Sequence, residues 1–422
     1  MKIYDNPPIE LWAELCARPV QSDEGLSARV GAILERVRLG GDGALRELAL
    51  EIEGKAPASL EFSAAEIEAA AGKVSPEVKA AVKEAAANIE AFHKAQRPSE
   101  VVVETAPGVK CIQKPVPIAK VGLYIPGGTA PLFSTILMLA IPARIAGCSE
   151  VILCTPAQSP EVLYTASYCG IKRIFRVGGA QAAAAMAYGT ATIPRVDKIF
   201  GPGNRYVTAA KQMLGLSRVA IDMPAGPSEV MVIADDDASP AFVAADLLSQ
   251  AEHGMDSQVM LVCRSSAFAE QVQREIELQT AALDRSAFVQ GALSCSRTVV
   301  FRDNDDAVAF AEAYAPEHLI INTARPWDIA SRITAAGSVF VGSYSPESAG
   351  DYASGTNHTL PTCGWARSFS GVNIDSFMRK MTIQELSREG LRGLSGTIIS
   401  MAEAEGLQAH ANAVKVRLDE SK

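Results

Sequence analysis

Several common signals are missing from this chain of 422 residues, and each absence excludes a class of protein. No apolar run approaches the roughly 18 residues that a membrane-spanning helix needs. The first residues, MKIYDNPPIELW, lack the apolar core of a signal peptide. Lys and Arg number 39 against 48 Asp and Glu, and this net charge of -9 argues against nucleic acid as the main partner. We therefore expect a cytoplasmic protein that binds neither membranes nor nucleic acids.

Paired cysteines are missing as well. The eight cysteines are scattered singly, and none forms a C-x-x-C pair. Most lie in apolar surroundings such as VILC and VMLVC, where Cys behaves as a small hydrophobic residue. We expect buried free thiols in a reducing compartment and no disulfide framework.

The chain does contain two series of short β-rich runs that alternate with helical segments. One series runs from KVGLYIP to KIFGPG, and the second runs from EVMVIAD to GSVFVG. Alternation of this kind predicts parallel sheets covered by helices. Two series predict an α/β protein with two Rossmann-like parallel-sheet units side by side and a ligand cleft between them. Helical periodicity at both ends of the chain predicts helical N-terminal and C-terminal extensions.

The expected domain division follows these series. Residues 1–24 form an N-terminal helical arm, residues 25–118 and 229–365 form a first, discontinuous α/β domain, and residues 119–228 form a second. Residues 366–422 form a C-terminal helical tail. Because this tail is too short to hold a large core of its own, we expect it to pack on the body or on a second subunit.

Histidine is scarce, and only five occur in the chain. His93 lies in a polar helical stretch, AFHKAQ, and we expect it at the surface. The other four lie in the settings QAEHG, PEHL, GTNH and LQAH. Gln250 and His253 lie three residues apart at the end of a predicted helix and project from one face, so they could grip a metal ion. A capping or hydrogen-bonding role is at least as well supported by this spacing alone.

Two further residues could complete a metal site. Asp351 lies in a Gly- and Ser-rich loop after a predicted strand, where a carboxylate is either a metal ligand or a turn residue, and spacing alone favours the turn. His410, near the chain end, could likewise be a metal ligand or have another role. Together, Gln250, His253, Asp351 and His410 form an N/O set that would suit zinc with open positions for substrate. Their spacing does not show that they converge.

Glu317 and His318 are adjacent in APEHLIINT and lead into a predicted strand. Neighbouring residues on an extended chain point in different directions, so each could touch a different part of one substrate. A His can accept a proton near neutral pH, and a Glu can orient or deprotonate water. A surface polar pair remains an equal alternative.

Three glycine-rich segments each follow a predicted strand: YIPGGTAP, VGGAQAAAAM and FGPGN. Backbone N–H groups in such turns could hold a pyrophosphate. Tyr124, in the first segment, could stack on a nicotinamide or adenine ring or fill the core. None of the segments matches G-x-G-x-x-G, so a tight strand-to-helix turn is the alternative to a dinucleotide site.

Longer motifs resemble the histidinol dehydrogenase family in order and spacing, from about residue 25 to 415. They are YIPGGTAPLFSTILMLAIPARIAGC, VGGAQA, DKIFGPGN, IDMPAGPSEV, DLLSQAEHG, YAPEHL, SPESAGDYASGTNHTLPT and AEGLQAH. The resemblance implies a homodimeric dehydrogenase that requires NAD and one zinc ion (Zn2+) per subunit. It also implies that the enzyme oxidises L-histidinol to L-histidine through bound L-histidinal, in the last steps of histidine biosynthesis.

The resemblance also implies roles for individual residues, and none of these positions departs from the family's pattern. The implied zinc ligands, which also contact the substrate, are Gln250, His253, Asp351 and His410. The other implied substrate-binding residues are Ser228, His318, His358 and Glu405. The implied general bases are Glu317 and His318. The implied NAD contacts, within residues 119–228, are Tyr124, Gln181 and Asn204. The C-terminal tail would cross to the partner, so that Glu405 and His410 complete the partner's site.

Two other functions remain as alternatives. A paralogous zinc- and NAD-dependent dehydrogenase of another polar alcohol, such as sulfopropanediol, would keep the zinc ligands and the base. Glu405 favours histidinol, because an amine needs an anionic partner. A catalytically silent zinc-binding protein would need neither Glu317 nor His318, so the presence of both argues against it.

Overall fold

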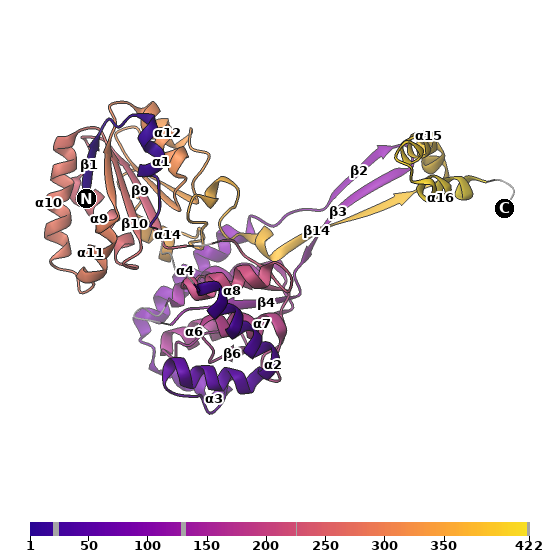
Figure 1. The fold of residues 1–422 in the computed structure, drawn as a ribbon, viewed down its shortest axis with the longest axis horizontal. Helices are drawn as coiled ribbons and strands as arrows, with labels where there is room; N and C mark the ends of the chain where they lie inside the picture. The colour runs from indigo at the N-terminus through magenta and orange to yellow at the C-terminus, as the bar shows by residue number, and fades with distance from the viewer. Residues whose placement is uncertain (20–24, 128–131, 225, 420–422) are drawn as a thin grey trace.

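The protein is described by a computed structural model that covers residues 1–19, 25–127, 132–224 and 226–419. Two parallel sheets covered by helices form the body, and a long antiparallel arm projects from it (Figure 1). The predicted α/β class with two parallel-sheet units is confirmed. Within the described ranges, no helix is both long enough and apolar enough to cross a lipid bilayer.

The six-stranded sheet is parallel throughout, with the strand order β1-β11-β10-β9-β12-β13. Its strands are β1 (Lys2–Asp5), β9 (Glu229–Ala234), β10 (Gln258–Cys263), β11 (Arg297–Val300), β12 (His318–Asn322) and β13 (Ser338–Val341). Side chains alternate along β9, so Val230 and Val232 pack in one hydrophobic cluster while Met231 and Ile233 pack in another. Burial on both faces explains why these strands are continuous apolar runs in the sequence.

Helices cover both faces of this sheet. One layer contains α9 (Pro240–Ala251), α10 (Ser266–Thr280) and α11 (Ser286–Ser294). The other contains α1 (Trp12–Leu15), α12 (Asn304–Tyr314) and α13 (Trp327–Ala330). Two short helical segments complete the unit: η1 (Ile9–Leu11) and α14 (Glu347–Tyr352).

The five-stranded sheet is also parallel, with the order β6-β5-β4-β7-β8. Its strands are β4 (Lys120–Tyr124), β5 (Glu150–Cys154), β6 (Arg173–Phe175), β7 (Lys198–Phe200) and β8 (Ala220–Ile221). One face is covered by α3 (Ala64–Lys73), α4 (Pro76–Lys94), α5 (Phe133–Ala146) and α6 (Pro160–Tyr168). The other is covered by α2 (Leu26–Glu53), α7 (Gly179–Tyr188) and α8 (Arg205–Gly215).

The packing of α2, α3 and α4 corrects the expected domain division. These helices were expected with residues 229–365, but they bury their apolar faces on the five-stranded sheet instead. Val30 of α2 packs in the same cluster as Tyr124, and Ile89 of α4 packs in the same cluster as Val121. Helical periodicity shows which face of a helix is buried, but it does not show which sheet covers that face.

Helices lie at both chain ends, as expected, with α1 in the N-terminal segment and two helices in the C-terminal tail, but each end also contains a strand. β1 lies within residues 1–24 and pairs in parallel with β11 at the edge of the six-stranded sheet. In the C-terminal tail, β14 (Met378–Leu386) is a strand and not a helix. Most of its residues are exposed, so no one-sided apolar pattern marks it in the sequence.

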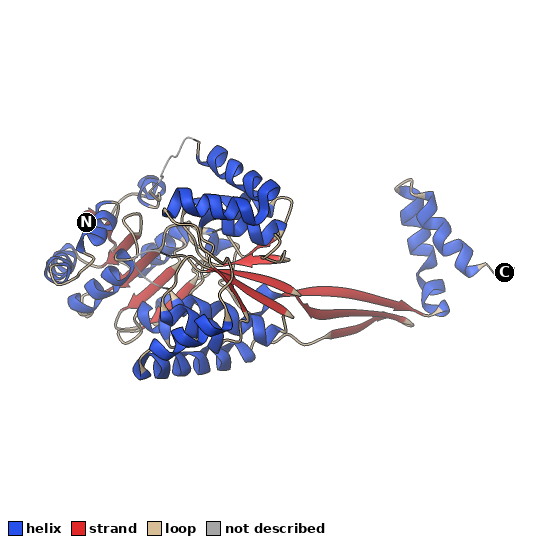
Figure 2. Cartoon of the chain, turned by 90° about the horizontal axis from the view of Figure 1, so that it is seen from below, coloured by secondary structure: helices blue, strands red, loops and turns tan. Residues whose placement is uncertain are grey.

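The arm is an antiparallel sheet of β14, β3 (Val109–Pro117) and β2 (Val101–Ala106), in that order. Two short segments, η2 (Trp365–Arg367) and η3 (Ile374–Phe377), lead into it. At its outer end stand α15 (Arg388–Ala404) and α16 (Gln408–Leu418), well away from both parallel-sheet units (Figures 1 and 2).

The eight cysteines are unpaired thiols. Cys154, Cys169 and Cys263 are buried, as expected, and burial raises the pKa of each thiol. Cys363 is exposed, so the expectation of burial is wrong for this residue.

Candidate active site

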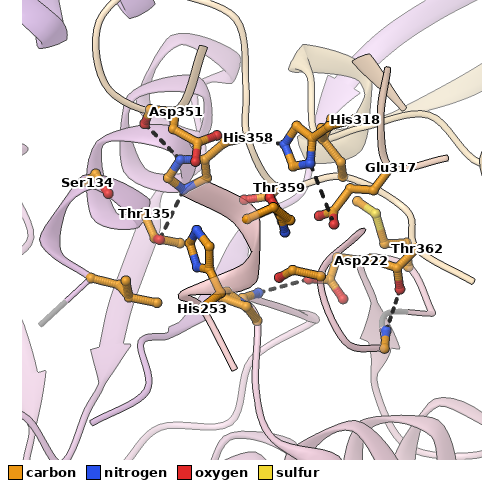
Figure 3. Close-up of a pocket in the computed structure, with 18 of the residues that line it drawn as sticks. Ser134, Thr135, Asp222, His253, Glu317, His318, Asp351, His358, Thr359 and Thr362 are labelled. Carbon is orange, nitrogen blue, oxygen red and sulfur yellow. Dashed lines mark hydrogen bonds and ion pairs between the residues drawn. The ribbon is translucent and has the colours of Figure 1, made fainter. Parts of the chain in front are cut away.

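A cavity of about 120 Å³ lies between the two parallel-sheet units; we call it the interunit pocket (Figure 3). The six-stranded unit and the loop after it contribute Ser228, Gln250, His253, Glu317, His318, Asp351, Tyr352, His358, Thr359, Leu360 and Thr362. The five-stranded unit and the segment that follows it contribute Leu132, Ser134, Thr135, Gly201, Pro202, Asp222, Met223 and Gly226. The pocket therefore brings together seven residues to which the sequence assigned roles.

The strand order explains the position of this pocket. In the five-stranded sheet, β4 and β7 are neighbours, and the connections that leave them run in opposite directions. Loops that diverge in this way leave a crevice at the carboxyl edge of a parallel sheet. Gly201 follows β7 and Thr135 belongs to the helix after β4, so both line the crevice. The six-stranded sheet faces it with the opposite edge, where β9 and β12 begin.

His318 is the first residue of β12, and its side chain is buried. Its Nδ1 atom lies 3.2 Å from the backbone oxygen of Glu229, a distance at which a protonated Nδ1 donates to that oxygen. The Nε2 atom has no hydrogen-bond partner within the described part of the chain. Asp351 Oδ1 lies 3.7 Å from it, too far for a hydrogen bond. A buried, unpartnered ring nitrogen beside a cavity is well placed to accept a proton.

Glu317, just before β12, is also buried. Its Oε2 atom accepts the backbone N–H of Glu229 at 2.9 Å and lies 3.7 Å from His318 Nδ1. Burial raises the pKa of this carboxyl to about 8, because a charged carboxylate is poorly solvated in the interior. Its carboxylate is therefore a stronger base than that of an ordinary Glu.

Asp351 lies on the short helix α14, so its expected place in a loop is wrong. His358 fixes the end of this helix, because its Nδ1 atom lies 2.8 Å from the Asp351 backbone oxygen. Its Nε2 atom lies 3.0 Å from Thr135 Oγ1 on α5 (Figure 3). His358 thereby connects the two units across the pocket, and both its ring nitrogens have partners within the chain.

Glu347 is a site residue that the sequence reasoning missed. It is buried on α14, and one ligand atom each from His253, Glu347 and Asp351 lie within 4.8 Å of one another. When the amide of Gln250 is oriented to satisfy its neighbours, its nitrogen donates to the Glu347 carboxylate at 3.1 Å. Glu347 precedes Asp351 by four residues, and this spacing would have placed both on one helix face if the segment had been interpreted as a helix.

These donors fit a zinc ion. An imidazole nitrogen and carboxylate oxygens, with Gln250 beside them, form an N/O set of the kind that catalytic zinc sites use. Burial lowers the pKa of His318, but the neighbouring carboxylates Glu347, Glu317 and Asp351 outweigh this effect and raise the pKa to about 10. A divalent cation beside these carboxylates would offset their charge and favour the neutral imidazole.

Glu405 and His410 lie elsewhere. Glu405 follows the last residue of α15 and His410 lies on α16, at the outer end of the arm (Figure 1). Neither residue lines the interunit pocket of its own chain.

The three expected NAD contacts line a second cavity of about 1110 Å³ on the five-stranded unit. Tyr124 accepts the backbone N–H of Gly179 at 3.1 Å, and Asn204 caps the N-terminus of α8. Gln181 lies in the first turn of α7 and is buried. Part of the motif YIPGGTAP, residues 128–131, lies outside the described residues.

His93 is buried, so its expected place at the surface is wrong. Its Nδ1 atom lies 2.8 Å from the Ile89 backbone oxygen, and its Nε2 atom lies 3.3 Å from Asn357 Nδ2. Asn357 directly precedes His358, so His93 supports the loop that carries this pocket residue. The polar residues next to His93 in the sequence led to the surface prediction, although His93 belongs to the buried face of α4.

Two parallel sheets that enclose a buried Glu–His pair and a cluster of residues able to bind a metal define a two-unit α/β enzyme. The family model for histidinol dehydrogenase matches residues 16–418. A histidinol dehydrogenase from Bacteroides fragilis (strain YCH46) is 54% identical over 425 residues, which cover 100% of this chain and 99% of the relative. One from Yersinia pestis is 52% identical over 408 residues, covering 96% of this chain and 92% of the relative.

A solved structure agrees with these relatives. The crystal structure of histidinol dehydrogenase from Elizabethkingia anophelis has a TM-score of 0.96 and 49% sequence identity, and it covers 99% of this chain and 98% of that one. The chain belongs to the histidinol dehydrogenase family and is an oxidoreductase.

Proposed function

We propose that this chain oxidises L-histidinol to L-histidine in two NAD-linked steps, with zinc bound in the interunit pocket. The observation that carries the proposal is that buried His318 lines the pocket and has no hydrogen-bond partner at Nε2 within the described residues, beside the ligand set of His253, Glu347 and Asp351. Family membership supports histidinol as the substrate.

The zinc ligands would be Gln250, His253 and Asp351, with His410 from a second copy of the chain. A zinc ion held by these residues would supply a template that orients the substrate. Glu347 would hold the amide of Gln250 in place. Ser228 and His358, which line the same pocket, would contact or enclose the substrate.

His318 would move the protons of the oxidation. Once a cation offsets the charge of the neighbouring carboxylates, the contact between Nδ1 and the Glu229 backbone oxygen would favour the neutral tautomer in which Nε2 is unprotonated. Nε2 would then take the hydroxyl proton of histidinol in the first step. In the second step Glu317 would deprotonate a water molecule for attack on the aldehyde, and His318 would assist again. Enclosure of the aldehyde between the two units would protect it from release.

The larger cavity would bind NAD, which supplies the hydride acceptor in each step. Gly178 and Gly179 at the start of α7 line this cavity, and backbone N–H groups at a helix N-terminus suit a pyrophosphate. Tyr124, Gln181 and Asn204 would contact the rest of the dinucleotide. The segment after β4 borders both cavities, because Pro126 and Gly127 line the larger one and Leu132 lines the interunit pocket.

The arm would cross to a second subunit of a homodimer. α15 and α16 stand away from the body of their own chain, so Glu405 and His410 are free to enter the pocket of another copy (Figures 1 and 2). The Glu405 carboxylate would pair with the amino group of histidinol.

Removal of the metal tests the zinc site. We expect that dialysis against a chelator abolishes NADH formation from histidinol, and that stoichiometric zinc restores it, because the substrate loses its anchor without the cation. Absorbance at the NADH band and metal analysis of the same samples measure both effects. Full turnover by enzyme shown to be free of metal would contradict the zinc assignment.

Replacement of Glu317 separates the two oxidation steps. We expect Glu317→Gln to slow histidinal oxidation more than the first oxidation of histidinol, because the amide cannot deprotonate water. With the pKa of Glu317 raised to about 8, the carboxylate forms as the pH increases through this value. The rate with histidinal should therefore rise with pH in the parent enzyme, and this rise should disappear in the variant. Equal slowing of both steps would argue against the role in water activation.

A further inference from the structure

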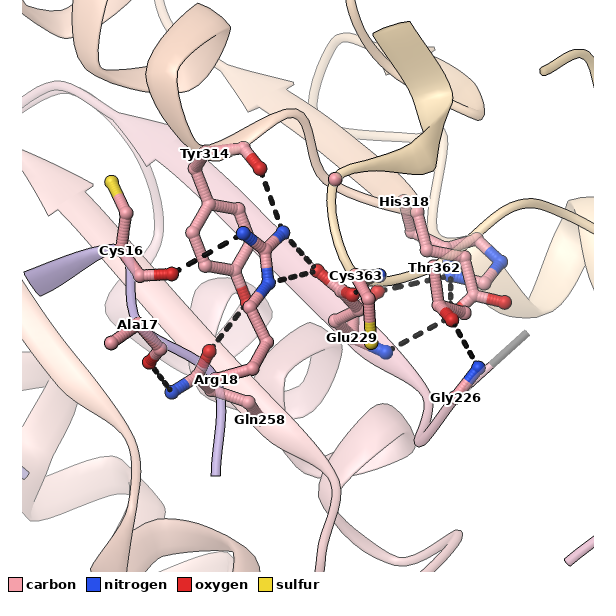
Figure 4. A network of polar contacts seen from close by, with 12 residues as sticks. Cys16, Ala17, Arg18, Gly226, Glu229, Gln258, Tyr314, His318, Thr362 and Cys363 are labelled. Carbon is pink, nitrogen blue, oxygen red and sulfur yellow. Dashed lines mark hydrogen bonds and ion pairs between the residues drawn. The ribbon is translucent and has the colours of Figure 1, made fainter. Parts of the chain in front are cut away.

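The side chain of Arg18 is hydrogen-bonded to Glu229, the first residue of β9 (Figure 4). Its Nε and Nη2 atoms both donate to Glu229 Oε2, at 3.2 and 2.6 Å. Nη2 also donates to the Tyr314 backbone oxygen at 2.7 Å, and Nη1 donates to the Cys16 backbone oxygen at 3.2 Å. The guanidinium stacks 3.7 Å above the ring of Tyr314. Planar hydrogen bonding combined with stacking is specific to Arg, and a Lys ammonium cannot reproduce it.

Through its backbone, Glu229 connects Arg18 to both proposed bases. Its backbone N–H donates to Glu317 Oε2 at 2.9 Å, and its backbone oxygen lies 3.2 Å from His318 Nδ1. The side chain is buried, and its other oxygen accepts the backbone N–H of Cys363, next to the pocket residue Thr362. Glu229 thus contacts the Glu317 carboxylate, the His318 ring and the loop next to Thr362.

Arg18 itself does not line the interunit pocket. It is 18% exposed in its side chain, whereas Glu229 is 2% exposed, so the pair is largely shielded from solvent. Without Arg18, the buried Glu229 carboxylate would form other hydrogen bonds, and the backbone of Glu229 would shift as it does so. A displacement of about 1 Å at a reacting group can lower the rate by about 10²-fold.

We infer that Arg18, from the N-terminal segment, is a positioning residue that sets the orientation of Glu317 and His318 through Glu229. This inference rests on the proposed roles of the two bases. It also gives the N-terminal segment a part in catalysis, because Arg18 holds Glu229 on the side away from the interunit pocket.

The test compares Arg18→Met and Arg18→Lys in the zinc-loaded enzyme. We expect kcat with histidinol to fall about 10- to 100-fold in Arg18→Met, while KM and zinc content change by less than about twofold, because the substrate ligands stay in place. Arg18→Lys should recover only part of kcat. The matched control is Arg302→Met. This change breaks the ion pair between Arg302 and Asp5, which also involves the N-terminal segment but does not line the pocket. It should leave kcat unchanged.

A second readout does not depend on the substrate. The ring ¹⁵N signals of His318, identified by their loss in His318→Asn, report its tautomer. In the zinc-loaded parent enzyme they should show one fixed tautomer with Nδ1 protonated, and in zinc-loaded Arg18→Met they should move toward the average of two tautomers. If the parent enzyme does not oxidise histidinol but these signals still change, the proposed function fails and the positioning role stands. Unchanged kcat and unchanged ring signals in folded Arg18→Met would overturn the positioning role.

A double variant covers the case in which Arg18→Met is unstable. Arg18→Met combined with Glu229→Gln removes the orphaned charge, so the fold should be retained while kcat stays low, because neither side chain then anchors β9. Full recovery of kcat in the double variant would show that Arg18 only neutralises Glu229, and it would overturn the inference.

Discussion

Replacing His318 with Asn is expected to lower the turnover of histidinol by about 10²- to 10⁴-fold, the usual contribution of a positioned general base. The imidazole is buried at the start of β12, His318 lines the pocket, and Nε2 has no hydrogen-bond partner within the described residues. Asn is close in size and can occupy the same space, but its amide cannot accept a proton near neutral pH. The loss should therefore fall on kcat and leave KM and zinc content nearly unchanged.

Steady-state NADH formation with saturating histidinol measures this effect, and metal analysis with thermal unfolding controls for loss of the site. A variant that is folded, zinc-loaded and within about threefold of the parent kcat would remove His318 from the mechanism. A large rise in KM at normal kcat would assign His318 to binding alone.

Mixing two inactive variants is expected to restore activity if the sites are shared between subunits. His318→Asn and His410→Asn should each be inactive as pure homodimers. In a mixed dimer one site keeps its own His318 and receives His410 from the other chain, whereas the second site loses both. One of the two sites in each mixed dimer is therefore intact, so the purified mixed dimer should have about half of the parent activity.

Two differently tagged chains, co-expressed and purified through both tags, give the mixed dimer for this measurement. The position of α16 at the outer end of the arm is the physical reason for the expectation, because His410 is absent from the pocket of its own chain. The absence of activity in verified mixed dimers would contradict the crossed arrangement. Activity in pure His410→Asn would show that the fourth ligand is dispensable.

Patterns in the sequence were sufficient for the elements that depend on local chemistry. The central strands β9, β10 and β12 are largely apolar runs, because each is buried on both faces. Gln250 lies in the last turn of α9 and His253 just after the helix, and both line the interunit pocket. Glu317 and His318 stand at the start of a strand, as expected, since the β-rich run begins immediately after them.

Other site residues could not be assigned in this way. Glu347 was missed because the Gly- and Ser-rich composition around it is typical of a loop, whereas in the structure the segment is the helix α14, whose end contacts the side chain of His358. Arg18 has no local pattern at all, and its partner Glu229 is 211 positions away in the chain. The burial of His93 likewise depends on Asn357, 264 positions away.

The sequence alone therefore determined the α/β class and the positions of most strands of the two parallel sheets, because periodicity and residue type act over a few neighbouring positions. The tertiary structure decided which sheet α2, α3 and α4 cover, that β14 is a strand, and that Glu229 links Arg18 to both proposed bases. These outcomes depend on contacts between segments far apart in the chain, and their free energies come from packing and burial that no local pattern encodes.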